Sequence, residues 1–245
     1  MFILFGMNEL KRVSEMKIKV WDLPIRICHW LLVIIIAFQF ISVKVLDEEM
    51  LANATQWHFY GGYACLAIVI FRILWGVLGT YYAKFSQFVI SPIKTLHYLR
   101  GKGSQDYIGH NPMGAYSVIA LLSLILAQAI SGLFTTDDIF NDAPYYGVLN
   151  NFWQAIANFI HHNIVYVLLG FIVLHIGVIL FYKIKHKKHL TSAMITGKKT
   201  VNEAVHSQGS FPWLGFIVCI AMTAITLYFI IEIWPPVPVD DYFGY

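Results

Sequence analysis

Charge is scarce in this chain. Only 13% of its 245 residues are aspartate, glutamate, lysine or arginine, whereas 58% are hydrophobic. An average soluble domain carries about 25% charged residues. This balance argues against a soluble enzyme and predicts a protein that crosses a membrane several times.

Cysteine is also scarce, and its spacing matches no binding pattern. The three cysteines, Cys28, Cys65 and Cys219, lie in apolar stretches and form neither CxxC nor CxxCH. Their spacing argues against a disulfide framework, a cysteine zinc site and a covalently attached c-type haem. We expect all three to be small apolar packing residues.

Long apolar stretches, by contrast, occur five times. A helix needs about 20 apolar residues to cross the hydrocarbon core of a bilayer, and this length is met by residues 24–43, 56–78, 112–134, 160–182 and 213–234. The loops between them are short, although residues 91–110 have room for a short interfacial helix. The sequence therefore predicts an all-α integral membrane protein with five transmembrane helices in a single domain, residues 1–245.

Basic and acidic segments alternate along the chain. The basic segments contain Lys11, Arg12, Lys17, Lys19 and Arg26, then Lys84, Lys94, Arg100 and Lys102, then Lys183, Lys185, Lys187, Lys188, Lys198 and Lys199. The acidic segments contain Asp47, Glu48 and Glu49, then Asp137, Asp138 and Asp142, then Glu232, Asp240 and Asp241. Because lysine and arginine stay on the cytoplasmic side, we expect a cytoplasmic N-terminus and a periplasmic C-terminus. The run KIKHKKHL (183–190) is then a solvated basic loop, with anionic lipid binding as the alternative.

Histidines within the predicted spans are the most informative residues, because ionisable groups there usually face the bundle interior and serve function. In the fourth span, His161 and His175 are 14 residues apart, nearly four helical turns. Both therefore project from one face, about 21 Å apart along the axis. His162 is 13 residues from His175 and points away from that face, so we favour His161.

The predicted topology sorts four histidines into two pairs by depth. His29 opens the first span on the cytoplasmic side, where His175 also lies. His58 opens the second span on the outer side, at the depth of His161. Two imidazoles that face each other across a helix bundle can supply both axial ligands of a haem b iron. The spacing predicts a four-helix bundle that holds two b haems, one between each pair.

Three alternatives to haem binding exist for these histidines. A single histidine in a membrane span is more often hydrogen-bonded to a neighbouring helix than bound to a metal. Zinc is a further alternative, although no carboxylate or thiol is expected at the same depths. A haem-free transporter would often show broken helices and internal repeats, and neither is found here.

The segments around these histidines resemble a known family. VWDLPIRICHW (20–30) resembles the opening of the first helix in the bacterial cytochrome b561 family, which includes the cytochrome b subunits of membrane-bound nickel-iron hydrogenases. WHFYGGYACLAIVIFRILWGVLGT (57–80) is similar to the second helix of that family, and HHNIVYVLLGFIVLH (161–175) to its fourth. The resemblance covers residues 20–182.

This resemblance implies an electron-transfer protein of the bacterial inner membrane. The family binds two b haems and passes electrons between a partner or substrate and membrane quinone, and its pattern supports His29, His58, His161 and His175 as iron ligands. His162 stands where relatives often have glutamate, so it is the alternative to His161. The implied partners are a periplasmic dehydrogenase, a hydrogenase or a c-type cytochrome, with quinone and the lipid bilayer but no nucleic acid. The fifth span has no histidine and is expected to be a packing helix or a partner contact.

Three further residues are candidates for the haem sites. Arg72 is a charge within the second span that can pair with a haem propionate, or else snorkel to the cytoplasmic headgroups. Arg26 lies near the same surface and has the same two possibilities. Gly62, about one turn after His58, lets either a flat porphyrin or another helix approach closely.

The segment GHNPMGAY (109–116) lies at the inner entrance to the third span. Asn111 suits a helix N-cap and Pro112 the first helical turn. His110 and Asn111 also offer polar contacts for a quinone carbonyl near the inner haem. We therefore take His110 and Asn111 as candidate quinone-binding residues.

Two functions fit these features. The first is the membrane electron-transfer subunit of a quinone-linked oxidoreductase, whose acidic outer segments could dock a basic partner. The alternative is a stand-alone superoxide:quinone oxidoreductase of the cytochrome b561 type. That enzyme needs positive charge above the outer haem to attract its anionic substrate. The outer segments offer only Lys44 as a cation, so electron transfer is favoured.

Overall fold

The computed structural model describes residues 16–44, 53–101, 107–136, 142–187, 189–201 and 209–236. Part of the charge pattern lies outside these ranges, namely Lys11, Arg12, Asp47, Glu48, Glu49, Lys102, Asp137, Asp138, Lys188, Asp240 and Asp241.

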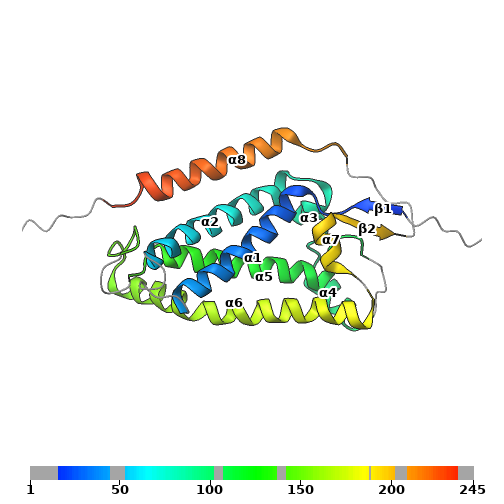
Figure 1. Cartoon of the computed structure of the whole chain (residues 1–245), viewed down its shortest axis with the longest axis horizontal. Coiled ribbons are helices and arrows are strands. Elements are labelled where there is room, and N and C mark those ends of the chain that lie inside the picture. Colours follow the sequence, from blue (N-terminus) through cyan, green and yellow to red (C-terminus); the bar gives the residue numbers. More distant parts are fainter. Residues whose placement is uncertain are drawn as a thin grey trace, which may run out of the picture.

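Five long helices form the body of the protein, as predicted, and each is long and apolar enough to cross a membrane, the last of them together with the turn that continues it to Ile233. They are α1 (Leu23–Lys44), α2 (Ala54–Leu78), α5 (Pro112–Gly132), α6 (Asn151–Lys185) and α8 (Trp213–Tyr228). A π-helical turn, η2 (Phe229–Ile233), continues α8. Figure 1 shows α8 along α2 at one edge of the bundle, with α6 at the opposite edge.

The longest helix, α6, extends beyond the span predicted for it. It begins at Asn151 and ends at Lys185, whereas the prediction covers residues 160–182. The side chain of Asn150 accepts a hydrogen bond from the main-chain N–H of Trp153 over 3.1 Å and so caps the helix start. A count of apolar residues identifies only the part of a helix that crosses the hydrocarbon core. It does not detect helical turns that extend beyond the core at either end.

Short elements gather at the end of the bundle where α1 begins. They are β1 (Met16–Lys19), η1 (Tyr81–Ala83), α3 (Phe85–Phe88), α4 (Pro92–Leu99), α7 (Leu190–Thr196) and β2 (Lys198–Val201). The short antiparallel pair β1–β2 is an addition to the predicted all-α fold, which the five long helices confirm. Gly197 has a left-handed φ of 78°, which suits glycine, and its carbonyl accepts from the N–H of Val20 over 2.8 Å. This turn ties the start of α1 to α7.

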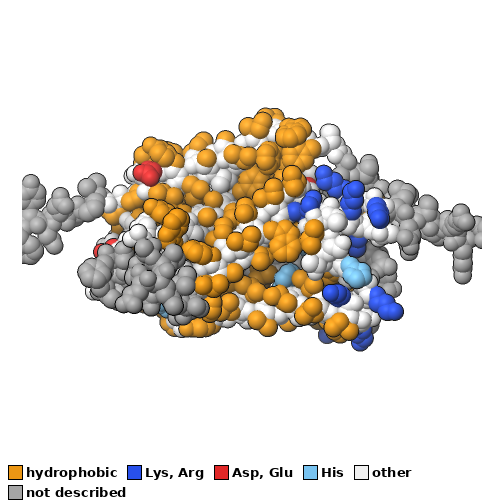
Figure 2. Space-filling model, in the orientation of Figure 1, with side chains coloured by type: hydrophobic (Ala, Val, Ile, Leu, Met, Phe, Trp, Pro, Cys, Tyr) orange, Lys and Arg blue, Asp and Glu red, His pale blue; other side chains and the backbone are white. Residues whose placement is uncertain are grey.

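Lysine and arginine concentrate at the same end, which we call the basic end. It carries Lys17, Lys19, Arg26, Lys84, Lys94, Arg100, Lys183, Lys185, Lys187, Lys198 and Lys199, and many of these blue side chains are visible in Figure 2. The exposed acidic residues within the described ranges, Asp142 and Glu232, lie at the opposite, acidic end. On the face shown in Figure 2, hydrophobic side chains cover most of the surface between the two ends, as expected for a surface in contact with lipid.

Four of the long helices make the bundle. α1 packs against α2, α2 against α5, and α5 against α6, while α8 packs on α2. Cys65, Val69, Ile125 and Leu168 are buried together at the middle of the bundle. All three cysteines are buried and free, which confirms their predicted packing role.

A buried carboxylate joins the start of α1 to the end of α2. Asp22 is 1% exposed, and its Oδ1 accepts a hydrogen bond from the N–H of Ile25 over 2.8 Å. Its Oδ2 accepts from Trp75 Nε1 over 2.9 Å and from Thr80 Oγ1 over 2.6 Å. Since unpaired buried donors are costly, Asp22 stabilises the basic end.

Replacing Asp22 by alanine is expected to lower the free energy of unfolding by about 3 kcal/mol, because it leaves three buried donors without an acceptor. Thr80→Val removes one of the three hydrogen bonds and should cost about 1 kcal/mol. Thermal unfolding in detergent, followed by tryptophan fluorescence, measures both changes. An unfolding midpoint for Asp22→Ala equal to that of the wild type would contradict the expectation.

Candidate functional site

The four predicted histidines meet in two pairs inside the bundle. His29 of α1 faces His175 of α6, with ring centroids 6.5 Å apart and ring planes at 53°; this is the basic-end pair. His58 of α2 faces His161 of α6, with centroids 6.2 Å apart and planes at 89°; this is the acidic-end pair. The structure thus brings together the same partners that depth and topology paired.

Both separations suit one iron ion held between two imidazoles. A metal–nitrogen bond of about 2 Å and a ring radius of about 1.1 Å place the centroids of two opposed imidazoles about 6.3 Å apart. The two observed separations, 6.2 and 6.5 Å, match this value. In the described part of the chain, His, Cys, Asp and Glu side chains form no group of three or more that could hold a metal. Pairs of histidine fit a haem, whose porphyrin supplies the other iron ligands, better than zinc, which takes three or four protein ligands.

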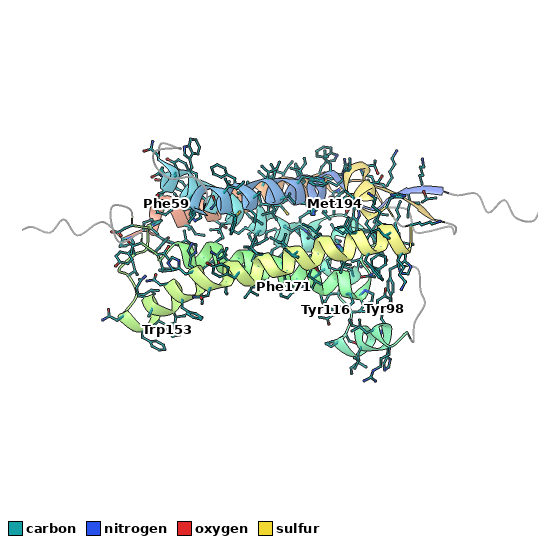
Figure 3. All side chains as sticks on the ribbon, turned by 60° about the horizontal axis from the view of Figure 1, so that its bottom comes forward. Phe59, Tyr98, Tyr116, Trp153, Phe171 and Met194 are labelled. Atoms are coloured by element: carbon teal, nitrogen blue, oxygen red, sulfur yellow. The ribbon has the colours of Figure 1, made fainter. Side chains whose placement is uncertain are left out.

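The two pairs lie at different levels of the bundle because α6 contributes one histidine to each. His161 and His175 are 14 residues apart, which corresponds to about 21 Å along a helix. In Figure 3, Trp153 and Phe59 lie toward the acidic end, and Met194 and Tyr98 toward the basic end.

A cavity of about 200 Å³ lies at the acidic-end pair. Its wall includes Gln39, His58, Gly62, Gln128 and His161. Among the described residues, a Cβ added at Gly62 would meet only Gln39 Nε2, at 3.9 Å, so the glycine widens the cavity on the α2 side.

His162 also borders this cavity, but its side chain is exposed. Its ring lies 5.8 Å from that of His161, nearly perpendicular to it. The partner that faces His58 is His161, so the geometry favours His161 over His162.

Two arginines at the basic end have unused donors. Arg72 is 6% exposed and lies with Cζ 4.9 Å from the ring centroid of Phe85, within reach of a cation–π interaction. Arg26 donates from Nη2 to the carbonyl of Ile195. Within the described residues, Arg72 Nη1 and Arg26 Nε are buried without a hydrogen-bond partner. Because such donors are costly when unpaired, both side chains fit the carboxylates of a cofactor.

His110 lies between two aromatic rings. Its ring centroid is 4.5 Å from Trp21 and 4.5 Å from Phe88, and its Nδ1 is buried without a hydrogen-bond partner in the described ranges. Burial, helped by the charges of Arg72 and Lys199, lowers the pKa of His110 to about 3. His110 is therefore neutral near pH 7.

This shift predicts acid sensitivity. The pKa of His110 falls from 6.5 to about 3 on folding, so between these values the unfolded chain binds a proton that the folded chain does not. Stability should then fall as pH is lowered from 6.5 toward 3. His110→Phe keeps a ring between Trp21 and Phe88 and should flatten this dependence. Unfolding midpoints of both proteins across this pH range measure the effect, and parallel curves would contradict it.

Asn111 has its side chain fully engaged. Its Oδ1 accepts from the N–H of Gly114 over 2.7 Å, which confirms the predicted cap of α5. Its Nδ2 lies 3.4 Å from Tyr98 Oη and 3.3 Å from Tyr182 Oη. Burial and the hydrogen bond with Tyr182 raise the pKa of Tyr98 to about 12, so Tyr98 keeps its proton.

Two glutamines at the acidic-end pair were missed in the sequence. Gln39 Nε2 donates to the carbonyl of His58 over 2.7 Å, and Gln128 Nε2 donates to the carbonyl of His161 over 2.8 Å. Each is an isolated polar residue within an apolar span. Polar residues within membrane spans are candidates for a functional role because they are costly to bury in hydrocarbon. Their position in the sequence could therefore have identified both glutamines.

Comparison with known proteins identifies the family of this chain. The family model described as prokaryotic cytochrome b561 matches residues 20–197. A "Probable Ni/Fe-hydrogenase B-type cytochrome subunit" of Rhizobium leguminosarum bv. viciae is 24% identical over 221 residues, covering 77% of this chain and 91% of the relative. A protein of the same description from Bradyrhizobium diazoefficiens is 21% identical over 221 residues, covering 77% and 88%. With its five apolar helices, this chain is a multi-pass membrane protein that belongs to the prokaryotic cytochrome b561 family.

Proposed function

We propose that this membrane electron-transfer cytochrome holds two b haems and carries electrons across the inner membrane, between a periplasmic redox partner and the quinone pool. The observation that carries the proposal is the two histidine pairs, each spaced for one iron, at two levels of α6. When bound, each haem iron takes up and releases one electron. Two sites stacked along one helix would connect the two membrane surfaces.

The orientation follows from the charge distribution. The basic end would face the cytoplasm and the acidic end the periplasm, by the positive-inside rule. The N-terminus would then be cytoplasmic and the C-terminus periplasmic, with residues 1–245 forming one domain. The basic-end pair becomes the inner haem site and the acidic-end pair the outer one.

Each candidate residue has a specific task in this scheme. His29 and His175 would hold the iron of the inner haem through their imidazole nitrogens. Arg72 and Arg26 offer buried, unused N–H groups to the propionates of that haem, because a guanidinium pairs well with a carboxylate. At the outer site, Gly62 leaves room on the cavity wall.

The quinone would bind near His110, at the basic end. The neutral ring of His110 has an unused buried Nδ1 that can accept from a quinol hydroxyl or donate to a quinone carbonyl. Asn111 would act by holding the hydroxyls of Tyr98 and Tyr182, since its own amide is already engaged. Because Tyr98 keeps its proton, its hydroxyl would serve as a hydrogen-bonding group rather than as an acid.

The redox partner is proposed to be a hydrogenase, since both relatives carry the name of a hydrogenase cytochrome subunit. A periplasmic dehydrogenase or a c-type cytochrome would use the same two sites. Helix α8 contacts α2 with one side, while Trp213, Leu214 and Ile217 on it are exposed. It is proposed as a packing helix whose free side meets lipid or the partner.

A reduced-minus-oxidised spectrum of the purified protein tests this function. Two b-type haems per chain, both reduced on addition of quinol, are expected. A protein that binds no haem when produced with ample haem would refute the proposal. Rapid reduction by superoxide, with no response to a hydrogenase, would instead support the superoxide:quinone oxidoreductase.

A further inference from the structure

The helices α5 and α6 are joined at His161 by a reciprocal pair of hydrogen bonds. The side chain of Gln128 donates from Nε2 to the carbonyl of His161 over 2.8 Å. In return, His161 Nδ1 lies 3.1 Å from the main-chain carbonyl oxygen of Gln128. With its proton on Nδ1, the imidazole donates to this carbonyl and leaves Nε2 free to bind a metal, the usual arrangement for a ligand histidine.

A glycine makes room for this ring. A Cβ built on Gly132 of α5 would lie 2.7 Å from His161 Cε1 and 3.0 Å from His161 Nδ1. Both distances are shorter than a normal van der Waals contact, so any larger residue at position 132 would push the imidazole out of its orientation. Gly132 therefore fixes where the ring lies, and Gln128 fixes how it is turned.

The other member of the pair is held in a related way. Gln39 of α1 donates from Nε2 to the carbonyl of His58 over 2.7 Å. A Cβ added at Gly61 would collide with the carboxamide of Gln39, so Gly61 makes room for that hydrogen bond. At the acidic end, the main-chain carbonyl of each of the two histidines thus accepts a hydrogen bond from a glutamine side chain. In each case a glycine beside the interacting side chains leaves the space that they need.

The basic-end pair has no such arrangement in the described residues. The ring planes of His29 and His175 lie at 53° to each other. Among the described residues, Nδ1 of His29 is buried without a hydrogen-bond partner, as is Nδ1 of His58 in the acidic-end pair, so the two pairs differ in the glutamine contacts and the ring angle. The acidic-end rings stand at 89°. The pair with the glutamine contacts is therefore the pair held nearly perpendicular.

We propose that Gln128 and Gly132 are positioning residues that hold the His161 imidazole perpendicular to that of His58, with Gln39 anchoring the His58 backbone. The inference rests on the proposed haem binding. The orientation of the ligand rings and the hydrogen bond to the ring nitrogen that does not bind the metal both influence the redox potential of a haem.

The angle between the rings has a spectroscopic consequence. When two imidazole ligands are perpendicular, the two iron d orbitals with which they interact are nearly equal in energy, and the low-spin EPR signal is strongly anisotropic. The acidic-end haem should carry that signal.

EPR spectra and redox titrations of Gly132→Ala and Gln128→Leu test the proposal. Both variants should shift the signal and the midpoint potential of the acidic-end haem, or lose that haem, and leave the other unchanged. Gly177→Ala is the matched control, because a Cβ at Gly177 of α6 would meet no atom of the described residues within 4 Å. The acidic-end signal is identified as the one that His161→Ala abolishes.

The outcomes separate the two proposals. A wild-type protein without two b haems refutes the proposed function. A wild type with two haems, and variants in which both signals and both potentials stay unchanged, overturns the positioning role alone. Equal loss of both haems in Gly132→Ala and Gln128→Leu also overturns it, because that result indicates a general packing defect.

Discussion

Alanine at any one of His29, His58, His161 and His175 is expected to lower the haem content of the purified protein from two per chain to one. Each substitution would leave one imidazole in place of two to hold the iron of that haem. The centroid separations of 6.5 and 6.2 Å are too long for a direct hydrogen bond between the rings. The rings are therefore spaced for an atom between them.

The matched control for this series is His162→Ala. His162 is a neighbouring histidine on the same helix, exposed and turned away from His58, so its removal should leave two haems. Haem counted by extraction, against protein concentration, measures every variant. If His162→Ala loses the outer haem while His161→Ala keeps it, the ligand assignment at that site is wrong.

Replacing Arg72 by glutamine is expected to lower the midpoint potential of the basic-end haem. A reduced haem carries one more negative charge than an oxidised one, so a nearby cation stabilises the reduced form. Loss of an interaction of about 1.4 kcal/mol corresponds to about 60 mV for a one-electron couple. Arg72 is 6% exposed, so water screens its charge little.

Two further variants test whether the change in midpoint potential comes from the charge and geometry of Arg72 itself. Arg72→Lys keeps the charge but loses the forked geometry that suits a carboxylate, so its shift should be smaller than that of Arg72→Gln. Arg100→Gln removes an exposed arginine at the same end and should change neither potential. A redox titration that shows equal shifts for Arg72→Gln and Arg100→Gln would contradict a specific role for Arg72.

Much of this protein follows from periodicity in its sequence. Hydrophobic length predicted five membrane helices because a bilayer sets how many apolar residues a helix needs. The 14-residue spacing of His161 and His175 predicted a shared face, since helical geometry repeats regardless of what surrounds the helix. Adding the alternation of basic and acidic segments was sufficient to predict which histidines would meet. Their role as iron ligands stays a prediction until the haem is counted.

Other features depended on contacts between distant segments, which one-dimensional patterns do not contain. The hydrogen bonds from Gln39 to His58 and from Gln128 to His161 join residues of different helices, and helix packing alone decides which polar side chain reaches which carbonyl. The Asp22 contacts with Trp75 and Thr80, and the β1–β2 pair, arise in the same way. The sequence by itself determined the helices and the faces their histidines share, because these repeat along one chain. Only the tertiary structure decided how each ring is held, because that depends on atoms brought within about 3 Å by packing.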